Sequence, residues 1–156
     1  MDKNNALELK IPPVAVFALF GGLMWLSASA VPFAGFSLSA TKPIALGVAA
    51  IGGVFAAAAI LSFLRAKTTI DPMKPGKAAS LVTTGVYAIT RNPMYLSLLF
   101  VLIGWAIYLS DLATLVVVPF FVLYMNRFQI TPEERALTSL FGSEFEAYCK
   151  RVRRWI

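Results

Sequence analysis

The sequence predicts an all-α polytopic membrane protein, and three observations support this fold class. Hydrophobic residues make up 58% of the chain and charged residues only 14%, a composition typical of integral membrane proteins. The apolar residues come in long runs without charge, separated by short segments rich in Pro, Gly, Lys and Arg. Uncharged runs of this length suit helices in lipid. At 156 residues we expect a single membrane-embedded domain over 1–156.

The first two apolar runs predict transmembrane helices at about 13–32 and about 44–64. Pro12 and Pro13 precede the first run, and proline is favoured in the first turn of a helix. The run is longer than the apolar core of a usual signal peptide and no clear cleavage site follows it, so we expect a retained anchor. The second run is rich in Gly and Ala, which allow helices to approach closely in lipid.

The third apolar run, 94–126, is too long for one span and contains one charge, Asp111. Ser110 or Asp111 is a good N-cap for a helix that follows it. The pattern therefore predicts a tight hairpin of two further transmembrane helices, at about 94–109 and about 112–128, which gives four transmembrane helices in all.

The last polar segment predicts an amphipathic cytoplasmic helix at about 132–153. Thr131, Pro132 and Glu134 suit the N-cap, first and third positions of a capping box. Apolar residues then recur at helical spacing, with charged residues on the opposite face. The residues of this apolar stripe are Leu137, Leu140, Phe141, Phe145, Tyr148 and Val152.

The distribution of basic residues predicts the orientation in the membrane. With four spans, 13 of the 14 Lys and Arg residues fall on the side of the two termini, and only Lys42 falls on the other. The positive-inside rule places that side in the cytoplasm. We expect a prokaryotic cytoplasmic membrane, contacts with membrane lipids, and no nucleic-acid partner despite a net charge of +6. The Gly and Ala face of the second span allows a homo-oligomer.

Several kinds of chemistry are excluded by composition. The chain has no histidine, which removes the commonest general base and metal ligand. Its one cysteine, Cys149, permits neither an internal disulfide nor a cysteine-based metal site. We therefore expect no metal.

Two polar segments flank the predicted hairpin, so both lie at the same membrane face. This topology brings residues of the first segment close to residues of the second: Tyr87, Arg91, Asn92 and Tyr95 to Arg127, Glu133 and Glu134. A site there would have water on one side and lipid on the other. Each residue also has a structural interpretation, since Arg91 suits a membrane anchor, the tyrosines an interfacial belt and Glu134 a helix cap.

Both segments resemble a known family. Residues 81–95, LVTTGVYAITRNPMY, resemble the L-V-T-x-G-x-Y-x-x-x-R-H/N-P-x-Y motif of the isoprenylcysteine carboxyl methyltransferases and phospholipid methyltransferases. The second segment resembles the tail E-E-x-x-L, F-G, Y-x-x-x-V-x-R of these integral membrane enzymes. The matching residues there are Glu133 to Leu137, Phe141, Gly142, Tyr148 and Val152 to Arg154.

The resemblance implies S-adenosylmethionine as the methyl donor, with S-adenosylhomocysteine as the product. It implies catalytic roles for Arg91, Glu134 and Arg154, and substrate binding by Arg127 and Arg91. The cofactor-binding residues that it implies are Ala79, Ser80, Leu81, Val82, Gly85, Tyr87, Asn92, Pro93, Met94, Tyr95, Glu133 and Glu134. The histidine frequent in the family motif is Asn92 here, and the N-terminal half is shorter than in the eukaryotic members.

Methyl transfer from a sulfonium needs alignment and exclusion of water more than a strong base, which suits a chain without histidine. We expect a hydrophobic or amphipathic acceptor that presents a carboxylate, thiol or amine at the cytoplasmic face. Two alternatives stay open. One is an NADPH-dependent membrane reductase related to the sterol reductases, and the other is a non-enzymatic membrane accessory protein.

Overall fold

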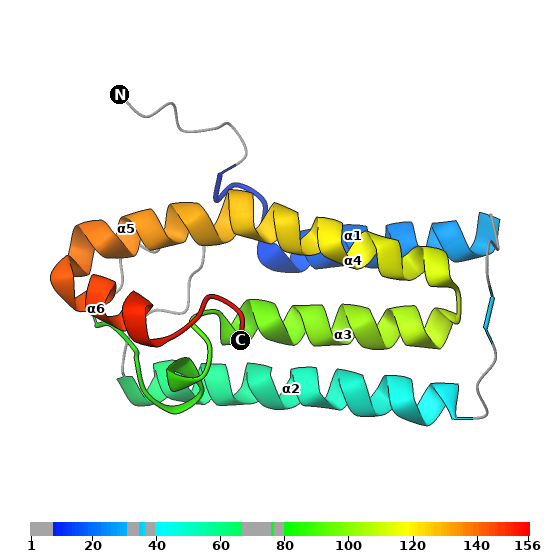
Figure 1. The fold of residues 1–156 in the computed structure, drawn as a ribbon, viewed down its shortest axis with the longest axis horizontal. Helices are drawn as coiled ribbons and strands as arrows, with labels where there is room; N and C mark the ends of the chain where they lie inside the picture. The colour runs from blue at the N-terminus through cyan, green and yellow to red at the C-terminus, as the bar shows by residue number, and fades with distance from the viewer. Residues whose placement is uncertain (1–7, 31–34, 37–39, 67–75, 77–79) are drawn as a thin grey trace.

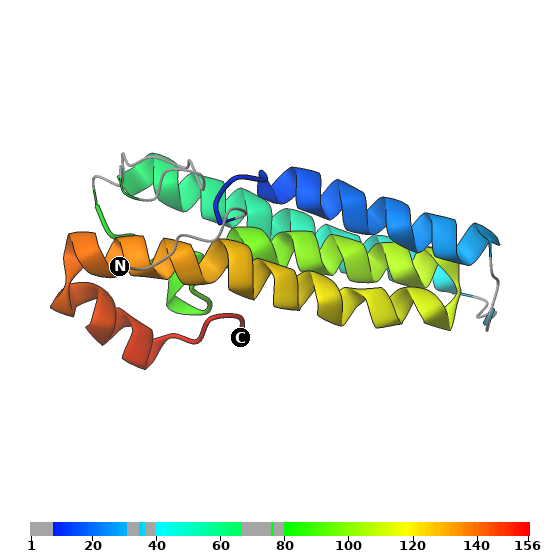
Figure 2. The ribbon, with the colours of Figure 1, turned by 90° about the horizontal axis from the view of Figure 1, so that it is seen from above.

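The protein is all-α, as expected. The computed structural model describes residues 8–30, 35–36, 40–66, 76 and 80–156, and within these residues helices dominate. The one β-type pairing in the described part of the chain is an isolated bridge between Gly35 and Asp111. The long helices lie side by side as one elongated bundle, and the C-terminal helices project beyond one end of it (Figures 1 and 2).

The first two helices are α1, Pro13–Ala30, and α2, Thr41–Ala66. Helix α1 begins at the proline expected to open it. Helix α2 extends beyond the expected 44–64 at both ends. It packs along α3, whereas α1 packs on α3 and α4, so α3 lies between the other long helices (Figure 1).

Helices α3, Pro93–Leu109, and α4, Leu112–Met125, follow each other directly. Ser110 ends α3 in the left-handed conformation with φ 54°. Asp111 then caps α4, because its Oδ1 accepts a hydrogen bond of 2.8 Å from the Ala113 amide. The expected cap at this turn is confirmed, and it lets the chain reverse within two residues.

Three helices in the described residues are long and apolar enough to cross a membrane: α1, α2 and the continuous helix Leu112–Phe141. Helix α3 is apolar but shorter, with 17 residues. An integral membrane protein is therefore supported, while the expected fourth crossing stays a prediction. Large apolar side chains cover the outer surface of the bundle, among them Leu19, Trp25, Leu46, Val54, Leu64, Val116, Phe120 and Leu123.

Close packing between α2 and α3 depends on two glycines. A Cβ at Gly52 would lie 2.7 Å from the Ser97 carbonyl oxygen, and one at Gly104 would lie 2.8 Å from the Ala45 carbonyl oxygen. No larger residue fits at these points without moving a backbone. On its other side α3 joins α1 and α4 in the main core, where Leu102, Phe121 and Met125 are almost fully buried.

Helix α4 does not end where a new helix was expected to start. It continues through a π-helical turn, η3 (Asn126–Ile130), into α5 (Thr131–Phe141). The expected capping box at Thr131 is therefore wrong: Thr131 lies inside the helix, and its hydroxyl donates to the Asn126 carbonyl at 2.7 Å. Pro132 has no N–H, so the Phe128 carbonyl four residues earlier lacks its usual helical donor.

The expected single helix at 132–153 is also wrong, because Gly142 divides it. Gly142 has φ +50°, a conformation that glycine adopts without steric cost. The chain turns there, and α6, Ser143–Arg151, runs back beneath α5 (Figure 2). This turn buries Phe145 and Tyr148 of the expected stripe against Leu81, Leu137 and Phe141, whereas Leu140 stays exposed.

Residues after α6 return to the start of α3. The Arg91 amide donates to the Arg153 carbonyl at 3.0 Å. The side chains of Thr90 and Asn92 both donate to the Arg154 carbonyl, at 3.3 Å and 2.8 Å. The two polar segments predicted to meet are therefore tied together directly at one end of the bundle.

Candidate active site

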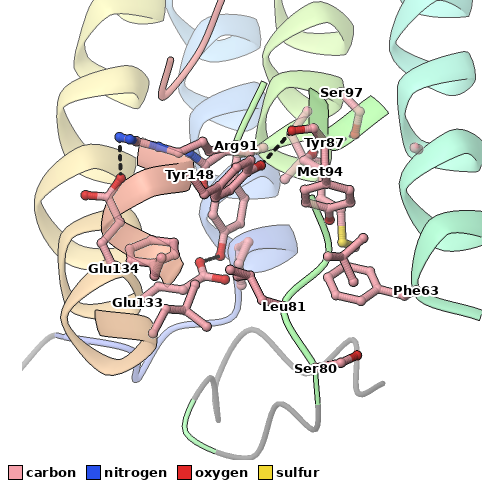
Figure 3. A pocket seen from close by; sticks show the side chains of 18 of the residues that line it. Phe63, Ser80, Leu81, Tyr87, Arg91, Met94, Ser97, Glu133, Glu134 and Tyr148 are labelled. Carbon is pink, nitrogen blue, oxygen red and sulfur yellow. Dashed lines mark hydrogen bonds and ion pairs between the residues drawn. The ribbon is translucent and has the colours of Figure 1, made fainter. Parts of the chain in front are cut away.

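A cavity of about 290 Å³ lies where the two polar segments meet. Its walls come from α1, α2, α3, α5 and α6 and from residues 80–92 (Figure 3). Its lining is mostly apolar. The lining residues are Pro13, Val14, Ala56, Phe63, Ser80, Leu81, Val82, Tyr87, Arg91, Asn92, Met94, Tyr95, Ser97, Leu98, Glu133, Glu134, Leu137, Phe145 and Tyr148.

Glu134 holds two arginines at one side of this cavity. The Arg91 Nη2 atom lies 2.8 Å from Glu134 Oε1, and the Arg154 side chain donates to both oxygens of the same carboxylate. Arg91 Nη1 also donates to the Cys149 carbonyl at 3.1 Å. The Glu134 carboxylate is thus paired with two cations, and these ion pairs hold both arginines in position.

One nitrogen of the Arg91 guanidinium is left unsatisfied in the described part of the chain. Its Nε atom is buried and has no hydrogen-bond partner among the described residues. A buried donor without an acceptor is costly, and since Arg91 lines the cavity, a bound ligand with an acceptor oxygen would remove that cost.

Glu133 differs from its neighbour. The Tyr95 hydroxyl donates to Glu133 Oε2 at 2.9 Å, and no described Lys or Arg forms an ion pair with Glu133. The side chain points into the cavity beside Leu81 (Figure 3). An acidic group without a cation, in a mostly apolar cavity, is suited to bind a positively charged ligand.

Aromatic side chains form a further part of the lining. The Tyr148 hydroxyl on α6 donates to the Tyr87 carbonyl at 2.7 Å. Phe63 of α2 packs edge-on against the Tyr87 ring, with 5.3 Å between centroids. Burial raises the pKa of both Tyr87 and Tyr148, so both stay neutral and serve as apolar walls with fixed hydroxyls.

Comparison with known proteins is consistent with this geometry. The family model of the phospholipid methyltransferases matches residues 40–144. The chain belongs to the phospholipid methyltransferase family. The match includes α2, the cavity-lining segment, α3, α4 and both glutamates, so it covers most of the candidate site. The predicted family relationship is confirmed.

Two relatives of this family member were found among known proteins. It is 44% identical over 63 residues to an uncharacterized protein of Haemophilus influenzae, a match that covers 40% of this chain and all of the relative. It is 30% identical over 120 residues to the protein-S-isoprenylcysteine O-methyltransferase of Schizosaccharomyces pombe. That match covers 75% of this chain and 50% of the yeast enzyme. Family and relative together indicate a membrane methyltransferase.

Most residues assigned to the site from the sequence line the cavity of this phospholipid methyltransferase family member. They are Ser80, Leu81, Val82, Tyr87, Arg91, Asn92, Met94, Tyr95, Glu133 and Glu134. Ala79 lies outside the described residues. Gly85, with φ +64°, starts the turn η2 (Gly85–Ala88), and Pro93 starts α3. Neither lines the cavity, and Arg154 reaches it only through Glu134.

Arg127 lies elsewhere. It does not line the cavity; its guanidinium instead lies 2.6 Å from Glu8 and 5.4 Å from the centre of the Phe128 ring. The structure therefore does not bring Arg127 together with Arg91, with which it shared the predicted substrate role.

Sequence reasoning missed the part of the lining that comes from α1, α2 and the interior of α3. These residues are Pro13, Val14, Ala56, Phe63, Ser97 and Leu98. They lie in apolar helices whose pattern carries no local sign of a site. Phe145 and Tyr148, by contrast, lay on the predicted apolar stripe of the C-terminal segment, and their spacing could have suggested a shared wall.

Proposed function

We propose that this chain is an S-adenosylmethionine-dependent methyltransferase whose acceptor is hydrophobic or amphipathic. The observation that carries the proposal is the contrast between the two neighbouring glutamates. Glu134 is paired with two arginines, whereas Glu133 faces the cavity without a cation among the described residues. A cationic ligand is what Glu133 lacks, and membership of the family makes the sulfonium cofactor the leading candidate.

The residues of the cavity fit this cofactor chemically. Its ammonium and sulfonium groups are cationic, its carboxylate is anionic and its adenine is flat. Glu133 suits a cationic group, and the free Nε of Arg91 suits the carboxylate. Phe63, Tyr87 and Tyr148 provide aromatic surface against which an adenine can pack.

S-adenosylmethionine supplies an activated methyl group when bound. The chain itself contributes position and exclusion of water. Tyr95 fixes the Glu133 carboxylate through its hydroxyl, and the Glu134 ion pairs fix Arg91. The apolar walls keep water from the reacting atoms, which strengthens each electrostatic contact inside the cavity. These roles need alignment and do not need an imidazole base.

The acceptor is proposed to bring its apolar part from the lipid side. Val14 lines the cavity and is 66% exposed on the outer surface of the bundle, so the cavity reaches the lipid-facing surface near the start of α1. Ala56 and Ser97 line the part of the cavity that extends toward the middle of α2 and α3, which we call its deep part. About one helical turn further along α2, the two helices close together at Gly52. This part of the cavity suits a short hydrocarbon segment of the acceptor, whose reacting carboxylate, thiol or amine would then lie toward Glu133.

We further propose four crossings, with the termini and the site at the cytoplasmic face of a prokaryotic inner membrane. Helix α3, with 17 residues, would cross as one arm of a hairpin whose other arm is the longer continuous helix Leu112–Phe141, and its shortness suits a locally thinned bilayer. The basic residues support the orientation, since 13 of 14 fall on that side. Single cysteines at Lys42 and Lys150, in a Cys149→Ser background, test it: an impermeant maleimide should label the first only from outside and the second only from inside.

Calorimetric titration of detergent-purified protein with S-adenosylmethionine and S-adenosylhomocysteine tests the main proposal. Saturable binding by the wild type, weakened in Glu133→Gln and unchanged in Glu144→Gln, is expected. Glu144 is an exposed acid on α6, so its variant controls for the loss of one negative charge. Binding of NADPH instead would favour the reductase alternative, and binding of neither nucleotide would favour an accessory protein.

A further inference from the structure

The segment that precedes α1 contacts both sides of the π-helical turn η3. The Glu8 carboxylate forms ion pairs with Arg127 in the turn, at 2.6 Å, and with Arg135 in α5. The Glu8 side chain is only 6% exposed, while the two arginines are almost half exposed. The hydrogen bond from Arg127 lowers the pKa of Glu8, so its carboxylate is charged at neutral pH and bridges the two cations.

Backbone groups of the same segment complete the helix at this turn. Pro132 cannot donate to the Phe128 carbonyl, and the Leu9 amide donates to it instead, at 3.1 Å. The side chain of Gln129, fully buried, donates to the Ile11 carbonyl at 2.6 Å. Residues 8–11 thus supply both the donor that Pro132 lacks and the acceptor that buried Gln129 needs.

The turn decides which way the two glutamates point. A π-helical turn contains one residue more than an α-helical turn, so it rotates the following helix by about 100° relative to an uninterrupted one. Glu133 and Glu134 lie in the first turn of α5, which continues from η3, and both line the cavity. Without the extra residue the same side chains would leave the cavity wall.

We propose that Glu8 and Gln129 are positioning residues, which hold the turn η3 in its π-helical form and so keep Glu133 and Glu134 directed into the cavity. Neither residue lines the cavity, and nothing in the family motif marks either. The proposal rests on the proposed function for its effect on cofactor binding, but its structural part does not.

The test measures two quantities on the full-length purified protein. Hydrogen exchange without ligand reports the local stability of residues 131–141, and calorimetry with S-adenosylhomocysteine reports the site. The variants are Glu8→Gln, which removes the bridging charge, and Gln129→Leu, which removes the bond to Ile11 without changing charge. Glu8→Asp is the conservative variant, and Lys10→Gln is the matched control, since Lys10 is an exposed neighbour in the same segment.

We expect Glu8→Gln to speed amide exchange in residues 131–141 roughly threefold to fivefold, because the two arginines that pair with Glu8 are almost half exposed. Gln129→Leu removes a buried hydrogen bond, so its effect should be at least as large. Exchange in α2 and α3 should stay unchanged in both variants. The dissociation constant for S-adenosylhomocysteine should rise by a similar or larger factor. Glu8→Asp should restore much of the loss, and Lys10→Gln should match the wild type.

Other results overturn the proposal. Unchanged exchange in α5 shows that the segment does not hold the turn. Faster exchange throughout the bundle shows a general structural role. Faster exchange in α5 with unaltered cofactor affinity shows that the turn does not position the site. The wild type could bind no S-adenosylhomocysteine while the variants still speed amide exchange in α5. In that case Glu8 and Gln129 do hold the turn η3, and the proposed function fails.

Discussion

The side-chain amide of Asn92 donates to the carbonyl of Arg154 at 2.8 Å. This bond joins the start of α3 to the residues after α6, and Thr90 donates to the same carbonyl from one residue before Arg91. Arg91 is therefore held from both sides by backbone contacts as well as by Glu134. The position that is frequently histidine in the family motif serves here as a link between the two polar segments.

Replacing Glu134 should destabilise the fold. Glu134→Gln leaves Arg91 and Arg154 without a counter-charge, and their side chains are only 14% and 34% exposed. Fully buried pairs cost 3–5 kcal/mol when one partner is removed, so we expect about 1–2 kcal/mol at this partly exposed site. Thermal unfolding in detergent measures the change, with exposed Glu144→Gln as control. A melting temperature equal to the wild type would mean that these ion pairs contribute nothing.

Replacing Glu133 should weaken cofactor binding and leave the stability of the fold unchanged. In Glu133→Gln the amide oxygen can still accept the bond from Tyr95, and no ion pair is lost. Stability should therefore stay near the wild-type value. Loss of a charge-assisted contact to a cationic ligand should weaken binding of S-adenosylmethionine roughly 10-fold to 100-fold. Equal affinities in variant and wild type would show that Glu133 does not contact the cofactor.

The size of the side chain at position 56 should determine how long a hydrocarbon chain the acceptor can carry. Ala56→Leu adds side chain to the deep part of the cavity, whereas Ala57→Leu adds the same atoms to an exposed position of the same helix. For homologous acceptors each buried methylene contributes about 0.8 kcal/mol. The affinity for the acceptor should therefore rise with the length of its hydrocarbon chain, and this rise should stop at a shorter chain in Ala56→Leu than in the wild type or in Ala57→Leu. Matching chain-length profiles in the two variants would place the hydrocarbon elsewhere, and unchanged S-adenosylhomocysteine binding would confirm that Ala56→Leu folds.

Alanine substitutions at two adjacent glycines in α2 should have different effects on stability. A Cβ at Gly52 meets a carbonyl oxygen at 2.7 Å, while one at Gly53 meets nothing within 4 Å. Gly52→Ala should lower stability by about 1–3 kcal/mol through overpacking. Gly53→Ala should be neutral or stabilise by up to about 1 kcal/mol through helix propensity. Thermal unfolding of the pair checks this, and a loss of similar size in both would contradict the close contact between α2 and α3.

The meeting of the two polar segments could be predicted because it follows from topology alone. If both ends of an apolar hairpin lie at one face, Arg91 and Glu134 must be near each other. The family motif then selected most of the lining. The wrong prediction at Thr131 has a clear physical cause: Thr-Pro-Glu-Glu is a good helix start, but a donor from distant Leu9 allows the helix to continue past Pro132. Contacts across 119 residues, such as Arg127 with Glu8, leave no local sequence pattern.

The break at Gly142 was missed for a related reason. The apolar spacing on either side fits one helix, so periodicity alone favoured 132–153. The glycine conformation and the burial of Phe145 and Tyr148 decide the turn, and that burial depends on Leu81 and Tyr87, which are distant in the sequence. Single-sequence patterns describe the faces of helices well, but they do not say which partner a face will find.

The bond between Asn92 and Arg154 also sets an order of events during synthesis. The two residues are 62 positions apart, which the ribosome covers in roughly 3–12 s. Once α3 has been made, the nascent chain has Arg91 but lacks both glutamates until residues 133 and 134 are added, and it lacks the Arg154 carbonyl that holds Asn92 until the end of the interval. The proposed cofactor could not assist the early steps of insertion, because Glu133 and Glu134 of the candidate site are made only after α4. A protease or chaperone that recognises an unpaired arginine at the membrane surface would therefore have several seconds in which to bind each nascent chain before Glu134 is added.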